Sequence, residues 1–133
     1  MAFARIVLGV IGLGTLGFGV FAFVRPESLA EVVALTATAP EGFTELRAFY
    51  GGVEFGLAAF WIGAAFSKTL VRPALLSMFA VWALIAAARG VGILMDDTAT
   101  NFMLIALVTE ALSAVLAAAG LLSLRATDAS PAA

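Results

Sequence analysis

The sequence predicts an all-α integral membrane protein, with four transmembrane helices in an up-down-up-down four-helix bundle. The first reason is composition: 63% of the 133 residues are hydrophobic and 12% are charged, whereas soluble domains are roughly 45–50% apolar and about 25% charged. The second is that four segments approach or reach the ~20 predominantly apolar residues that a helix needs to cross a bilayer. The third is that no segment alternates apolar and polar residues as a half-buried strand does.

The four segments are residues 6–24, 49–66, 74–95 and 102–122, and we expect them to form a single membrane domain, 1–133. The first segment contains no charged residue, and each of the others contains one. We expect the first to be a retained helix rather than a signal peptide. It is longer than the usual ~7–15-residue apolar region of a signal peptide, and no suitable cleavage site follows it.

The connections differ in length and character. Residues 25–48 are long and acidic, and Pro26 suits the first turn of a short interfacial helix. That helix would present an apolar stripe made of Leu29, Val32, Val33 and Leu35. Residues 67–73 and 96–101 are short connections, which place neighbouring helices side by side and antiparallel.

Lysine and arginine predict the orientation, because cytoplasmic connections are enriched in them. One side carries Arg5, Lys68, Arg72 and Arg125, and the other carries Arg25 and Arg47. We therefore expect a multi-pass protein of the cell inner membrane with both termini in the cytoplasm. The opposite side is acidic, with Glu27, Glu31, Glu41, Glu45, Asp96 and Asp97.

Composition also excludes several classes of function. The net charge of −2 gives no basic excess for binding nucleic acid. The absence of cysteine and histidine excludes disulfides, thiol redox chemistry, Cys/His zinc sites and histidine-ligated haem. We expect no cofactor and no metal. Asp96 and Asp97, with Asn101 nearby, fit a solvated turn or cap better than a metal site, because no calcium-loop pattern is present.

Three charged residues lie within the predicted spans: Glu54, Arg89 and Glu110. A charge at the centre of a bilayer costs about 2.5–3.5 kcal/mol on insertion scales. At ~1.5 Å of rise per residue, all three lie roughly 8–12 Å deep from the non-cytoplasmic side. Because they occupy three different helices at a similar depth, we expect them to meet inside the bundle.

Helical spacing supports a polar pocket with aromatic walls. In the second span, Arg47, Tyr50, Glu54 and Trp61 share a face; in the third, Trp82, Arg89 and Asp96; in the fourth, Met103, Ala106, Glu110, Ser113 and Ala117. The pocket candidates are Glu54, Arg89, Glu110, Tyr50, Trp61 and Trp82. The pocket mouth would carry Glu45, Arg47, Asp96, Asp97 and Asn101.

The charges of this cluster do not balance, since it has two carboxylates and one guanidinium. Arg89 can hold one carboxylate with two parallel hydrogen bonds. The other carboxylate must keep its proton or neutralise a cationic ligand. The competing interpretation is structural, because polar contacts between membrane helices also tie them together.

Small residues follow the second span at Gly52, Gly56, Ala59 and Gly63. Small residues let membrane helices approach closely. This stripe lies roughly opposite the Glu54 face, so it either packs within the monomer or forms the seam of a homodimer.

The run Glu45-Leu-Arg-Ala-Phe-Tyr50-Gly51-Gly52-Val-Glu-Phe-Gly56-Leu resembles the bacterial membrane family catalogued as domain of unknown function 4345. An arginine late in the third helix, followed by aspartate two turns on, is similar to Arg89 and Asp96 here. The resemblance implies four helices and assigns no activity. It directs attention to Glu45, Arg47, Tyr50 and Arg89.

Several functions remain open. The pocket suits a small amphiphile or a membrane lipid. Alternatives are a proton-coupled exporter of cationic compounds, an intramembrane enzyme using carboxylate acid–base chemistry, and a structural subunit. Small four-helix exporters of this kind carry a glutamate in the first helix, and the first helix here has none. No nucleophile motif or catalytic residue identifies an enzyme.

Overall fold

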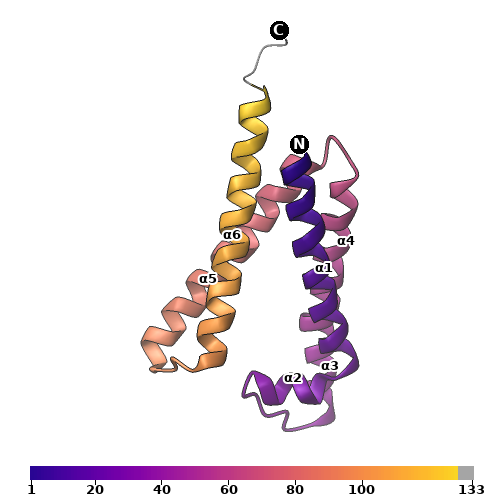
Figure 1. Cartoon of the computed structure of the whole chain (residues 1–133). Helices are drawn as coiled ribbons and strands as arrows, with labels where there is room; N and C mark the ends of the chain where they lie inside the picture. Colours follow the sequence, from indigo (N-terminus) through magenta and orange to yellow (C-terminus); the bar gives the residue numbers. More distant parts are fainter. Residues whose placement is uncertain (129–133) are drawn as a thin grey trace. The chain divides into compact units, whose positions relative to one another are not determined.

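The computed structural model describes residues 1–128, and it describes side chains up to residue 125. Every regular element in that range is a helix (Figure 1). In chain order the elements are α1 (Ala2–Val24), α2 (Pro26–Val32), α3 (Pro40–Leu46), η1 (Arg47–Gly52), α4 (Val53–Ala65), α5 (Val71–Asp96) and α6 (Asn101–Asp128). The predicted all-α class is confirmed.

Four helices are long and apolar enough to cross a membrane: Ala2–Val24, Pro40–Ala65, Val71–Asp96 and Asn101–Arg125. Each contains one of the four predicted segments almost entirely and extends beyond it at one end or both. The chain divides into two parts, residues 9–63 and residues 1–8 with those from 64 onward. Each part is described by itself.

In the part formed by residues 9–63, α1 and α4 pack side by side and antiparallel (Figure 1). A β-carbon built on Gly12 would lie 2.8 Å from Ile62, and one built on Gly19 would lie 2.9 Å from Glu54. A third such contact joins Gly51 to Phe23. The residue numbers in these contacts rise on one helix as they fall on the other, as in an antiparallel pair. Glycine is needed at these points because the helices approach so closely.

The second membrane helix is longer than predicted. It begins at Pro40 rather than at residue 49, and it continues through α3, η1 and α4 to Ala65. Pro40 occupies the first turn, where proline is well tolerated, and extended Ala39 precedes it as the N-cap. Glu41 in that first turn complements the helix dipole.

The predicted short helix between the first two spans is present as α2. Leu29 and Ala30 are buried with Ala22 and Leu46, whereas Val32 is exposed. The expected apolar stripe is therefore divided between an inward and an outward face. The helix ends in a Schellman motif, in which the Leu35 N–H donates to the carbonyl of Ala30 at 2.8 Å. The left-handed position is taken by Ala34, with φ 56°.

In the other part, α5 and α6 form an antiparallel helical hairpin (Figure 1). The turn between them begins at Asp97, which has φ 51° at the C-cap of α5. Thr100 then caps α6, since its hydroxyl accepts a hydrogen bond from the Met103 N–H at 3.3 Å. Further along the hairpin, Leu75 packs where a β-carbon on Gly120 would lie, at 3.1 Å.

Candidate functional site

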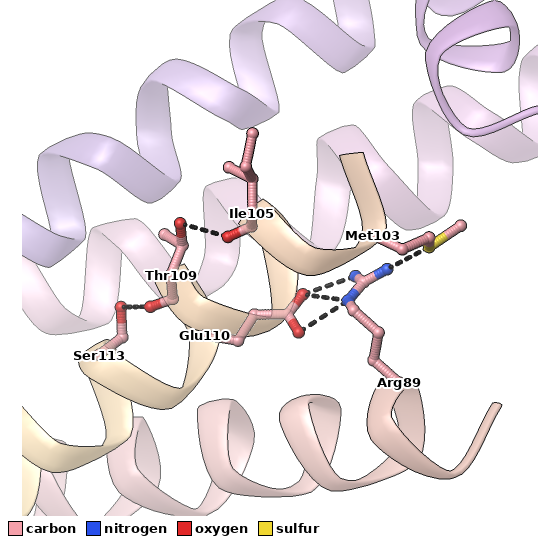
Figure 2. A network of polar contacts seen from close by, with 6 residues as sticks. All are labelled: Arg89, Met103, Ile105, Thr109, Glu110 and Ser113. Atoms are coloured by element: carbon pink, nitrogen blue, oxygen red, sulfur yellow. Dashed lines mark hydrogen bonds and ion pairs between the residues drawn. The ribbon is translucent and has the colours of Figure 1, made fainter. Parts of the chain in front are cut away.

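Arg89 and Glu110 form an ion pair between α5 and α6 (Figure 2). Arg89 Nε donates to both carboxylate oxygens, at 3.0 Å to Oε1 and 2.8 Å to Oε2. Arg89 Nη2 donates to Oε1 at 2.5 Å. Two nitrogens on one edge of the guanidinium thus face both oxygens of the carboxylate, which is the strongest geometry for this pair.

Met103 occupies the next edge of the same guanidinium. Arg89 Nη1 lies 3.3 Å from the Met103 sulfur, a weak acceptor (Figure 2). The sequence places Met103 and Glu110 seven residues apart on one helical face, so a single arginine on α5 reaches both. The predicted face of α6 is confirmed at these two positions.

Nearby hydroxyls do not compete for the carboxylate. Thr109 donates to the Ile105 carbonyl at 2.9 Å, and Ser113 donates to the Thr109 carbonyl at 2.8 Å (Figure 2). Both side chains are therefore bonded within α6. Glu110 is left to Arg89 as its charged partner.

Burial of the two side chains is unequal. The Glu110 side chain is 8% exposed and the Arg89 side chain is 25% exposed. The pair is formally neutral, which lowers the cost of placing it in hydrocarbon. The carboxylate is therefore enclosed, while part of the arginine remains accessible.

Glu54 lies in the part formed by residues 9–63, so its predicted convergence with Arg89 and Glu110 stays a prediction. Its β-carbon backs directly onto Gly19 of α1. Within residues 9–63 its carboxylate has no ion pair and no hydrogen bond. This is the carboxylate that the charge count leaves without an arginine.

Arg47 is held at the end of α1. Its Nε donates to the Phe23 carbonyl at 3.2 Å, which satisfies one of the last carbonyls of that helix. Arg47 also begins the π-helical segment η1, which ends at Gly52 and coincides with the Arg-Ala-Phe-Tyr-Gly-Gly run. Tyr50 in this segment is 36% exposed. Single π-turns of this kind frequently occur at functional sites.

The remaining predicted site residues divide by burial. Trp61 is fully buried, and its β-carbon lies against Gly12 of α1. Trp82 is half-buried. Glu45, Asp96, Asp97 and Asn101 are exposed. Asp97 forms the C-cap of α5, and no cluster of three potential metal-binding side chains occurs among the described residues.

The sequence did not predict three features of the part formed by residues 9–63: the contact of Arg47 with the Phe23 carbonyl, the π-helical segment, and the buried Thr15. Thr15 lies between Gly12 and Gly19 on the face of α1 that meets α4. Its side chain is buried, and its hydroxyl has no hydrogen-bond partner among the described residues. The spacing of three and four residues from the two glycines could have placed it on that face.

The small-residue stripe on the second span is not packed against another helix of residues 9–63. Gly52, Gly56, Ala59 and Gly63 are all exposed. A β-carbon on Gly56 or Gly63 would meet nothing within 4 Å. Within residues 9–63, packing against α1 therefore uses the glycines of α1 and Gly51 rather than this stripe.

These features define the class of protein: a helical, multi-pass membrane protein with charged side chains inside its spans. The chain belongs to the family described as domain of unknown function (DUF4345), whose pattern matches residues 3–121. The resemblance noted from the Tyr-Gly-Gly run is thereby confirmed. No curated protein and no solved structure matches the chain.

Proposed function

We propose that this protein binds a small amphiphile or a membrane lipid through the charged side chains of its spans. The observation that carries the proposal is the Arg89–Glu110 pair, in which an enclosed carboxylate holds an arginine whose side chain is still 25% exposed. Ionisable residues inside membrane spans are rare and commonly mark ligand or ion paths. A polar headgroup would reach the accessible part of Arg89, or the carboxylate of Glu54.

The surrounding surface suits the tail of such a ligand. On the face of α5 that carries Arg89, Ile85 lies one helical turn away and is exposed, and Trp82 lies two turns away and is half-buried. Within the bilayer the tail of such a ligand leaves lipid rather than water, so van der Waals packing against this surface holds it. A polar anchor beside a long apolar surface is the usual composition of an amphiphile site.

We place the protein in the cell inner membrane with both termini in the cytoplasm. Four crossings put the two ends on the same side. The bias of Lys68, Arg72, Arg5 and Arg125 over Arg25 and Arg47 supports the cytoplasm as that side.

A purely structural role for the pair is the second candidate. Three hydrogen bonds join Arg89 to Glu110, so the pair can tie α5 to α6 without any ligand. Such contacts in membranes contribute about 0.6 kcal/mol each on average. Only a binding site retains a ligand, so ligand retention distinguishes the two roles.

Native mass spectrometry of the protein extracted from its own membrane tests the proposal. We expect wild type to retain an adduct with the mass of an amphiphile. The triple variant Glu54→Gln/Arg89→Met/Glu110→Leu removes all three charges of the spans, and it should lose most of that adduct. Thr109→Ala is the matched control, since Thr109 bonds only to its own helix, and it should keep the adduct. An adduct of equal intensity in the triple variant, or none in wild type, contradicts the proposal.

A further inference from the structure

We infer that Glu54 binds a positively charged ammonium headgroup, so that the ligand is a cationic amphiphile. This inference rests on the proposed function and names the chemical class of its ligand. It comes from the helix pair α1–α4 and the acidic rim at its end, all within residues 9–63.

The first step is the fixed position of Glu54. It lies within the membrane helix that runs from Pro40 to Ala65. On its inner side its β-carbon meets α1 at Gly19, where an added β-carbon would lie only 2.9 Å away. The two backbones are too close for the glutamate stem to turn back between them. The stem of the Glu54 side chain is therefore held beside α1.

The second step is that Arg47, the cation on the same membrane helix as Glu54, is remote from it and already engaged. Arg47 is seven residues before Glu54, roughly 10 Å along the helix axis. Its Nε is bound to the Phe23 carbonyl. Within residues 9–63 Glu54 therefore has no cationic partner, and we assign that role to the ligand.

The third step is a buried acceptor on α1, one helical turn from the glycine that meets Glu54. Thr15 is 4% exposed, and its hydroxyl has no partner among the described residues. Thr15 is one turn from Gly19 on the face of α1 that meets α4. A buried hydroxyl without a partner is costly, and an ammonium N–H would satisfy it. An alkylammonium carries three N–H donors, enough for Glu54 and Thr15 together.

The fourth step is the charge of the entrance. Residues 25–47 follow α1 and lead into η1, and they carry two arginines against four glutamates. The glutamates are exposed: Glu27, Glu31, Glu41 and Glu45. An acidic rim raises the local concentration of cations and repels anions. The rim and the half-buried Glu54 thus favour the same sign of ligand.

Three ligands with the same twelve-carbon tail test the inference: dodecylammonium, dodecanol and dodecanoate. They are titrated into wild type in nanodiscs of zwitterionic lipid, and binding is read by native mass spectrometry. We expect dodecylammonium to bind at least about tenfold more tightly than the other two. Glu54→Gln should abolish that preference, because the amide keeps the shape and removes the charge.

Further variants separate charge from shape. Glu54→Asp keeps the carboxylate and should retain part of the preference. Thr15→Val is isosteric without the hydroxyl and should weaken dodecylammonium about two- to fivefold. Glu45→Gln removes one charge of the rim and should weaken the binding of dodecylammonium slightly. High salt should remove that small difference from wild type, while the preference for dodecylammonium over the other two ligands remains.

The possible failures are distinguishable. If none of the three ligands binds, the proposed function fails and this inference fails with it. If all three bind equally, or if Glu54→Gln keeps the preference for dodecylammonium, amphiphile binding stands and the role of Glu54 is overturned.

Discussion

At the scale of single residues, the Arg89–Glu110 pair illustrates how a membrane span accommodates charge. Arginine remains protonated under all ordinary conditions, whereas a carboxylate can take up a proton and become neutral. The two partners are therefore not equivalent. Removing Glu110 leaves a permanent charge, while removing Arg89 leaves a group that can neutralise itself.

This asymmetry predicts unequal costs. Glu110→Leu should lower the free energy of unfolding by about 2–3 kcal/mol, because it leaves Arg89 unpaired within the membrane. Arg89→Met should cost about 1 kcal/mol, and the double variant less than Glu110→Leu alone. Unfolding titrations in mixed micelles measure all three, with Thr109→Ala as the control. Two equal and additive single effects would contradict the account of the pair.

The bonding of Arg89 to a carboxylate could be predicted from the sequence, but not which carboxylate it binds. The sequence indicated that Arg89 would hold one carboxylate with parallel hydrogen bonds, and the structure shows that the carboxylate is Glu110. Hydropathy alone could not decide between Glu54 and Glu110, because both lie at similar depth. The contact of Arg89 with the Met103 sulfur depends on rotamers that spacing does not determine.

At the scale of elements, the glycines of α1 divide into two sets that the sequence does not distinguish. Gly12 and Gly19 meet α4, whereas Gly9, Gly14 and Gly17 have nothing within 4 Å of an added β-carbon. The first set permits close packing. The second set has no steric role among the described residues.

Two matched substitutions test this division. Gly19→Ala should destabilise the protein by about 1–3 kcal/mol, since its new methyl group would meet the Glu54 β-carbon, which cannot swing away. Gly17→Ala should be neutral or stabilise by up to about 1 kcal/mol, because alanine is the better helix former. Thermal unfolding followed by circular dichroism measures both. An equal loss in the two variants would show that the division is incorrect.

The helical periodicity of the sequence could not predict the π-helical segment. The predicted faces assumed 3.6 residues per turn, and that assumption keeps Arg47, Glu54 and Trp61 on one side. The structure agrees for those three residues, which all lie toward α1. Tyr50 falls inside the wider π-turn and is partly exposed, so its place in a pocket wall stays a prediction.

At the scale of the whole molecule, we propose a second copy of the chain as a partner. Gly52, Gly56, Ala59 and Gly63 form an exposed stripe on the second span, and such stripes let helices from two protomers approach closely. The chain has no cysteine, so single-cysteine variants give clean cross-links. Gly56→Cys should form a disulfide-linked dimer in native membranes, and Gly14→Cys on α1 should not. Recovery of monomer alone from Gly56→Cys contradicts this partner.

Hydropathy predicted the number of spans well, because a segment that crosses lipid must form its backbone hydrogen bonds internally, as a helix does. The ends of the helices were less predictable, since Pro40 and Glu41 extend the second helix through residues that hydropathy scores as polar. The whole account depends on four crossings, which place Glu54, Arg89 and Glu110 within the membrane.

Labelling of single cysteines with a membrane-impermeant maleimide tests those crossings most directly. The positions are Thr36→Cys and Thr98→Cys in two connections, and Thr69→Cys in the third, all exposed. Intact cells should label Thr36→Cys and Thr98→Cys, while Thr69→Cys should react only after permeabilisation. Labelling of Thr69→Cys and Thr98→Cys from the same side would mean that α5 does not cross the membrane, and it would contradict the account.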